Sequence, residues 1–175
     1  LVHNGHVPTF DRVRPRLLDR LGDDRRQAVR GTTDSEHVLA LLLQLRGEAP
    51  GAPLHTVTRK AVHLVQDWVT GVAADATVRA TDAEFQSLSH DELEHFLGLN
   101  LLWTDGDTLG GSRLNRTLWT RRRTRVHTCS ICGHAHADPP ADADYRSVTL
   151  ASERLTNEDW TEVPNGSVFH VDETG

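Results

Sequence analysis

The spacing of apolar residues changes once along this chain, near residue 97, and that change restricts the fold class. Before it, apolar side chains recur every three or four residues over 10–21, 38–45 and 54–69, which is the period of an amphipathic helix. From Leu97 the run L-G-L-N-L-L-W-T favours a strand instead. Helices followed by short strands predict an α+β fold with antiparallel sheets.

Turn residues give these elements their expected boundaries. The strand over 97–104 precedes Asp105-Gly106, a pair that accepts positive φ and predicts a type I′ turn to a partner strand over 108–113. Further strands are expected at 117–121, 146–152 and 167–171.

The helix starts can be predicted from capping residues. Pro15 is tolerated only in a first turn, so the first helix should begin between residues 11 and 14, with Thr9 or Asp11 as its cap. Asp34 is the expected N-cap of the third helix, with Glu36 favourable in its first turn.

Length and charge limit the classes of partner. A chain of 175 residues with a net charge of −6 reads as one domain whose surface does not suit a polyanion such as nucleic acid or an anionic membrane. The sequence has no apolar run of membrane-spanning length and no secretory leader pattern, so we expect a cytoplasmic protein without nucleic-acid or membrane partners. The first residue is Leu1 and the chain contains no Met, which suggests that it continues a longer protein.

The stretch H-N-G at 3–5 has two interpretations. Asn4-Gly5 is a common turn signal, and a plain loop after a strand would account for it. The alternative is an oxyanion hole, because an Asn side-chain amide and a neighbouring Gly N–H are neutral donors that can converge on one developing negative charge.

The stretch G-T-T-D-S-E-H at 31–37 also has two interpretations. Asp34 can simply cap the helix that follows it. A carboxylate on a loop before a helix can also bind the ammonium group of a substrate.

These stretches together resemble the class II glutamine amidotransferases, which are N-terminal-nucleophile hydrolases. The resemblance rests on V-H-N-G at 2–5, T-D-S-E at 33–36, L-N-L-L-W-T-D-G-D at 99–107, and V-T-L-A-S-E-R-L-T with W-T-E-V-P-N-G-S-V at 148–168. Within this family, the chain is similar to the branch that contains the ergothioneine-pathway γ-glutamyl hydrolase and the amidotransferase subunit of the glutathione-degrading complex. The implied fold is part of an αββα sandwich, with residues 1–175 as the C-terminal portion of one amidotransferase domain.

The resemblance also implies a mechanism and its residues. A cysteine would attack the amide of glutamine or a γ-glutamyl compound and form an acyl-enzyme, with Asn4 and Gly5 as the oxyanion hole. Asp34 would receive the α-ammonium group of the substrate, with His3 and Thr33 also at the substrate. The family's nucleophile is not among these residues, so the parent protein is expected to be the enzyme and this segment alone to be inactive. The same resemblance is compatible with a homo-oligomer or with a synthetase or peptidase partner.

The insert at about 122–145 is rich in metal-binding side chains. Cys129 and Cys132, spaced C-x-x-C, could bind a structural zinc together with His134 and His136, and His127 is a further candidate. The alternative is an exposed loop that binds nothing, since one C-x-x-C lacks a distant second pair. No cofactor is needed for catalysis. Two other functions stay open: a zinc-binding interaction module and a catalytically inactive partner subunit.

A run of arginines at 121–125 precedes this insert. We expect it to form a solvated edge strand or to pair with the acids Asp138, Asp142 and Asp144, because a nucleic-acid contact conflicts with the negative net charge.

Overall fold

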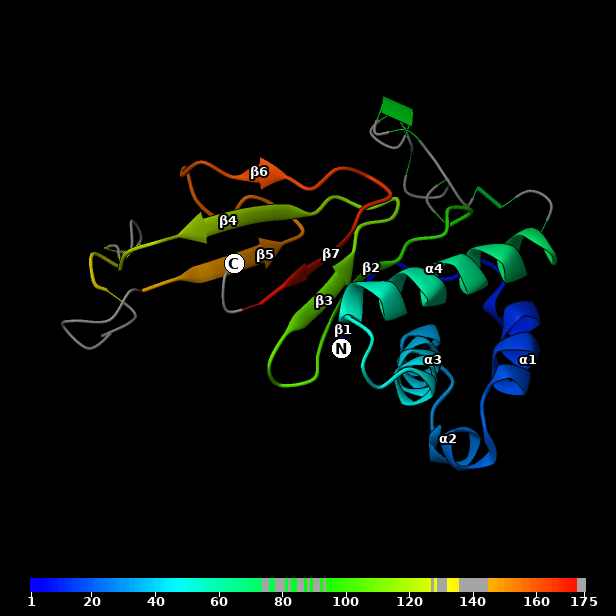
Figure 1. Ribbon diagram of the computed structural model, residues 1–175. Helices are drawn as coiled ribbons and strands as arrows, with labels where there is room; N and C mark the ends of the chain where they lie inside the picture. Colours follow the sequence, from blue (N-terminus) through cyan, green and yellow to red (C-terminus); the bar gives the residue numbers. More distant parts are fainter. Residues whose placement is uncertain are drawn as a thin grey trace.

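A computed structural model gives the fold (Figure 1) and describes residues 1–175 except 74–75, 78–80, 82, 85–86, 88, 90–91, 93, 127, 129–131, 136–144 and 173–175. The short strand β1 (Val2–Asn4) comes first. Four helices follow: α1 (Phe10–Arg20), α2 (Asp23–Ala28), α3 (Asp34–Glu48) and α4 (Leu54–Thr70). The other strands are β2 (Asn100–Thr104), β3 (Leu109–Ser112), β4 (Trp119–Arg123), β5 (Ser147–Ala151), β6 (Thr161–Glu162) and β7 (Val168–Val171). This order confirms the predicted α+β class.

The strands form two antiparallel sheets. The first has the order β1-β2-β3-β7, and the second has the order β5-β4-β6. Figure 1 shows α3 and α4 beside the four-stranded sheet, with the three-stranded sheet extending away from the helices. The first sheet is therefore the platform on which the helices pack.

The core lies between α3, α4 and the helix-facing side of β2. Leu41, Leu101 and Val65 are fully buried there, and Trp103 is 4% exposed. One polar chain crosses this core: Trp103 Nε1 donates to Thr58 Oγ1 over 2.8 Å, and that hydroxyl donates to the Leu54 carbonyl over 2.8 Å. A buried polar group without a partner is costly, so this chain satisfies the indole and the hydroxyl together.

The opposite face of the four-stranded sheet is less covered. Side chains alternate along a strand, so the register that pairs Val2 with Leu102 and Gly111 with Phe169 directs all of these away from the helices. Val2 is 64% exposed, and Leu102 and Phe169 are partly exposed. Apolar side chains on this face of the sheet are therefore open to solvent.

The start of α1 differs from the prediction. The helix begins at Phe10, not between residues 11 and 14, and Pro15 lies inside it. Pro15 removes the N–H that would bond to the Asp11 carbonyl, but Asp11 is exposed, so water can satisfy that group. Thr9 occupies the N-cap position with φ 51° and makes no capping hydrogen bond through its side chain.

The turn between β2 and β3 also differs. Thr104 pairs with Leu109, which leaves a four-residue loop in place of the predicted two-residue type I′ turn. Only Gly106 has positive φ, at 108°. Asp105 Oδ1 instead accepts the Thr108 N–H over 3.1 Å, and this side-chain bond closes the loop.

The arginines of β4 do not form an edge. β4 is the central strand of its sheet, between β5 and β6, and β6 was not predicted from the sequence. Arg121 and Arg123 each bind Glu158 over 2.8 Å, whereas the expected partners Asp138, Asp142 and Asp144 lie outside the described residues. None of the described helices has the length and apolar character needed to cross a membrane.

Candidate functional site

The chain turns sharply at Gly5, immediately after β1. Gly5 has φ 143°, and a Cβ atom there would lie 2.2 Å from the Gly98 carbonyl oxygen. The Gly98 N–H donates to the His6 carbonyl over 2.9 Å, which holds the two backbones together. Both the φ value and the close approach require glycine at this position.

Two hydrogen-bond donors are uncommitted at this turn. Asn4 is exposed, and its side chain makes no hydrogen bond to any residue that the structure describes. The Gly5 N–H likewise donates to no described group. Adjacent uncommitted donors at a strand end are what an oxyanion hole needs, because they can bind a charge without breaking an existing bond.

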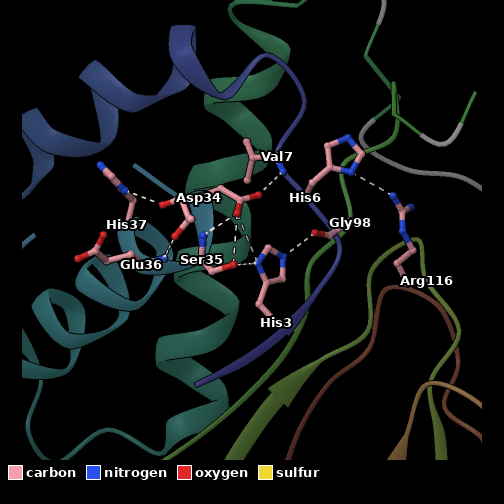
Figure 2. A network of polar contacts seen from close by, with 10 residues as sticks. His3, His6, Val7, Asp34, Ser35, Glu36, His37, Gly98 and Arg116 are labelled. Atoms are coloured by element: carbon pink, nitrogen blue, oxygen red, sulfur yellow. Dashed lines mark hydrogen bonds and ion pairs between the residues drawn. The ribbon is translucent and has the colours of Figure 1, made fainter. Parts of the chain in front are cut away.

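His3 points into the protein from the other side of β1. Its Nε2 lies 3.0 Å from the Gly98 carbonyl and its Nδ1 lies 2.8 Å from Ser35 Oγ, as Figure 2 shows. A carbonyl only accepts, so Nε2 carries a proton, while the Ser35 hydroxyl that contacts Nδ1 also donates to Asp34 Oδ1 over 3.3 Å. The side chain is 1% exposed, and it links β1 to the start of α3. A substrate contact by His3 stays a prediction.

Asp34 is the first residue of α3 and not its N-cap, which is Thr33. The Thr33 hydroxyl accepts the Glu36 N–H over 3.4 Å, so a threonine performs the capping predicted for the aspartate. The carboxylate of Asp34 accepts the Val7 N–H over 2.8 Å and the Ser35 N–H over 2.7 Å (Figure 2). Its side chain remains 18% exposed.

The structure brings Asp34, His3 and the turn at Gly5 together, but it separates Asn4 from Asp34 by the thickness of β1. Alternation along the strand directs Asn4 away from the helices, whereas Asp34 approaches from the helix side. A substrate touching both would therefore have to bind around the end of β1. The predicted substrate contacts of Asp34 and Thr33 stay predictions.

Arg116 is a neighbour that the sequence did not indicate. Its Nη2 lies 3.3 Å from His6 Nδ1 and its Nη1 donates to the Asn115 carbonyl over 2.6 Å. A Cβ at Gly98 would lie 3.1 Å from Arg116 Cζ, so the guanidinium lies against the glycine that contacts Gly5. Burial lowers the pKa of Arg116 below its usual value, yet an arginine stays charged at neutral pH. This charge favours an anion nearby.

The cysteine insert is only partly described. Cys132 and His134 are exposed, whereas Cys129, His136 and His127 lie outside the described residues. In the described part of the chain, no three His, Cys, Asp or Glu side chains are grouped to hold a metal ion. Zinc binding by the insert stays a prediction.

Comparisons with known proteins are consistent with this fold. No family model matches the sequence. The chain is 26% identical over 192 residues to the probable glutamine amidotransferase DUG3 of Saccharomyces cerevisiae, covering 97% of this chain and 48% of that protein. It therefore spans about half the length of this curated relative.

Solved structures give the fold. A glutamine aminotransferase class-II domain protein from Silicibacter pomeroyi superposes with a TM-score of 0.62 at 19% identity, covering 99% of this chain and 63% of that one. A predicted glutamine amidotransferase from Pseudomonas aeruginosa is less similar, with a TM-score of 0.49 at 22% identity over 81% of this chain and 49% of that one. The chain thus has the fold of the class II domain protein from Silicibacter pomeroyi, and its sequence is distantly similar to the yeast protein.

Proposed function

We propose that this chain is part of a class II glutamine amidotransferase-type hydrolase that cleaves the amide bond of glutamine or of a γ-glutamyl compound. The observation that carries the proposal is the pair of uncommitted donors at the end of β1, the Asn4 side-chain amide and the Gly5 N–H. The similarity to the yeast glutamine amidotransferase supports the same assignment.

The chemistry proceeds through a cysteine acyl-enzyme. The thiolate attacks the side-chain carbonyl carbon, and the C=O electron pair moves onto oxygen, where Asn4 and Gly5 donate hydrogen bonds to it. Collapse of this intermediate expels the amine, which takes a proton, and water then hydrolyses the thioester. Cys129 and Cys132 follow β4 in the sequence, far from Gly5 along the chain. The proposal therefore assigns the nucleophile to a cysteine outside these 175 residues.

Two charged groups lie near the turn at Gly5, one on Asp34 and one on Arg116. Asp34 uses its carboxylate for Val7 and Ser35, and a carboxylate has about four lone-pair sites, so its exposed part can still accept from a substrate ammonium group. Arg116 contributes positive charge beside Gly98. A glutamyl group carries both an ammonium and a carboxylate, which suits this arrangement.

The finer assignment concerns the amine that leaves. Glutamine releases ammonia, whereas glutathione and the γ-glutamyl intermediate of ergothioneine synthesis release larger amines. Assays of the full-length protein with glutamine and with glutathione separate these branches. A synthetase or peptidase partner belongs to the same proposal, because such partners consume the released product.

The test is the rate of γ-glutamyl hydrolysis by the full-length protein and its Asn4→Ala variant. Loss of one oxyanion donor should lower kcat about 100- to 1,000-fold with little change in KM. Asn157→Ala is the matched control, because Asn157 is exposed and lies outside the site. A loss of kcat below about threefold would remove Asn4 from this role.

A further inference from the structure

A cavity of about 540 Å³ lies between α4 and the segment that leads into β7. Arg59, His63 and Gln66 of α4 line one wall, and the end of β3 with residues 165–168 lines the other. Its volume falls within the range of about 300–1,000 Å³ that is usual for small-molecule sites. None of its lining residues belongs to the turn at Gly5 or to the Asp34 network.

The charge in this cavity is positive. Its lining contains no Asp or Glu, and it includes Arg59 and Arg113. Arg113 is already neutralised, because its Nη2 lies 2.9 Å from Glu162 Oε1. Arg59 and His63 are four residues apart and so share one face of α4, and no described acidic residue forms an ion pair with either.

The wall opposite α4 is polar and held in place. The Asn115 N–H donates to Asn165 Oδ1 over 2.9 Å, and Asn165 Nδ2 donates to Asn115 Oδ1 over 3.2 Å. The Gly166 N–H donates to the Arg113 carbonyl over 2.9 Å, with Gly166 at φ 76°. These bonds connect residues about fifty positions apart and fix the amide groups before any ligand arrives.

We propose that this cavity binds a small molecule that carries a phosphate or carboxylate group. Arg59 would donate charge-assisted hydrogen bonds to the anionic group, because its guanidinium presents several donors in a fixed plane. The hydroxyls of Ser112 and Ser167, with the amides of the opposite wall, would bind the polar remainder of the ligand. This site is separate from the proposed hydrolase site, so either can fail without the other.

The experiment titrates the full-length protein by NMR with inorganic phosphate, with citrate and with glycerol as the uncharged probe. Saturable shifts of the Asn115 and Gly166 amide signals at millimolar phosphate or citrate, without a response to glycerol, are the expected result. The stronger of the two anions identifies the group that the site prefers. No saturable shift with either anion overturns the proposal.

The variants test the location of the anion. Arg59→Gln should weaken binding at least about tenfold, because it removes the charge and keeps a good helix former. Arg59→Glu should abolish binding. Arg12→Gln is the matched control, since Arg12 is an exposed helical arginine away from the cavity, and it should bind as the wild type does. Equal binding by the Arg59→Gln and Arg12→Gln variants overturns the site.

Discussion

The carboxylate of Asp34 accepts the backbone N–H of Val7 over 2.8 Å, across 27 residues of sequence. This bond ties the segment after Gly5 to the first turn of α3, and Val7 itself is 4% exposed. The same carboxylate that the sequence suggested as a substrate ligand therefore also positions the turn that contains Asn4 and Gly5.

Asp34→Ala should destabilise the fold by about 1–3 kcal/mol, because it leaves the N–H groups of Val7 and Ser35 without their acceptor. Urea unfolding gives the free energy of unfolding. Asp11→Ala is the control, as an exposed acidic residue in the first turn of α1, and should change stability by less than about 0.5 kcal/mol. Equal losses for the two variants would show that the Val7 bond is unimportant.

Three glycine substitutions should separate steric clash from backbone strain. Gly5→Ala introduces both, since its Cβ would lie 2.2 Å from a carbonyl oxygen and the residue would have to keep φ at 143°. It should lower the free energy of unfolding by at least about 4 kcal/mol or prevent folding. Gly106→Ala meets strain alone, at φ 108° with open space around it, and should cost about 1–3 kcal/mol.

Gly47→Ala completes the series. It lies in α3 with nothing within 4 Å of its Cβ position, so it should stabilise the chain by about 0.5–1 kcal/mol. Thermal unfolding of the three variants checks the order. If the Gly5 and Gly106 variants unfold at the same temperature, the contact with Gly98 does not constrain the turn.

The bond between His3 and Ser35 can be measured by a double-mutant cycle. His3→Phe keeps a ring and removes both nitrogens, and Ser35→Ala removes the hydroxyl that is hydrogen-bonded to Nδ1. We expect a coupling free energy of about 1 kcal/mol between the two changes, the usual size for one hydrogen bond. A coupling near zero would mean that the contact between His3 and Ser35 does not stabilise the fold.

The Glu48 carboxylate should make stability depend on pH. Arg20 donates to both of its oxygens over 2.6 Å, and this side-chain hydrogen bonding, helped by Gln44, lowers the pKa of Glu48 to about 2. A lowered carboxyl pKa stabilises the fold above the unfolded-state value near 4.5, and the stabilisation disappears as the pH falls toward 2.

Glu48→Gln should therefore lower the free energy of unfolding by about 0.2–1 kcal/mol at pH 7, the range for a pair open to solvent. The difference from the wild type should shrink between pH 4.5 and pH 2. Urea unfolding across this range measures it. A difference that persists unchanged at the lower pH would assign the effect to side-chain packing.

The zinc prediction needs a direct metal measurement. We expect about one zinc per chain in protein purified without chelator, and none after both Cys129 and Cys132 are changed to Ser, because zinc favours thiolate and imidazole ligands. Elemental analysis measures the content. His63→Ala, on α4, is the control and should leave the zinc content unchanged. Wild-type protein without zinc would favour the exposed-loop alternative.

The sequence predicted those features that depend on local spacing. The apolar period located α3 and α4, and alternation with turn residues located β2, β3, β5 and β7 close to their observed positions. Features that depend on distant partners were missed. β6 is a two-residue strand that exists because Glu162 pairs with Trp119, and no pattern within two residues can indicate it.

The candidate site shows the same limit. The segments H-N-G and T-D-S-E contact each other in the structure, but the direction of each side chain depends on contacts far along the chain. His3 is buried because it bonds residues 32 and 95 positions away, and nothing in its neighbours indicates this. Arg113 is fully buried only because Glu162 and distant carbonyls surround it, whereas an arginine read from sequence alone is expected at the surface.

The hydrogen-bonded chain from Trp103 through Thr58 to the Leu54 carbonyl also acts on the rotation of α4 about its own axis. Apolar contacts alone would allow a helix to rotate slightly on a sheet, whereas the directional hydrogen bond at Thr58 opposes this rotation. The next residue is Arg59, which lines the cavity, so the position of its backbone depends on a hydrogen bond inside the protein. Thr58→Val should therefore weaken the binding of the proposed ligand, although Thr58 does not line the cavity.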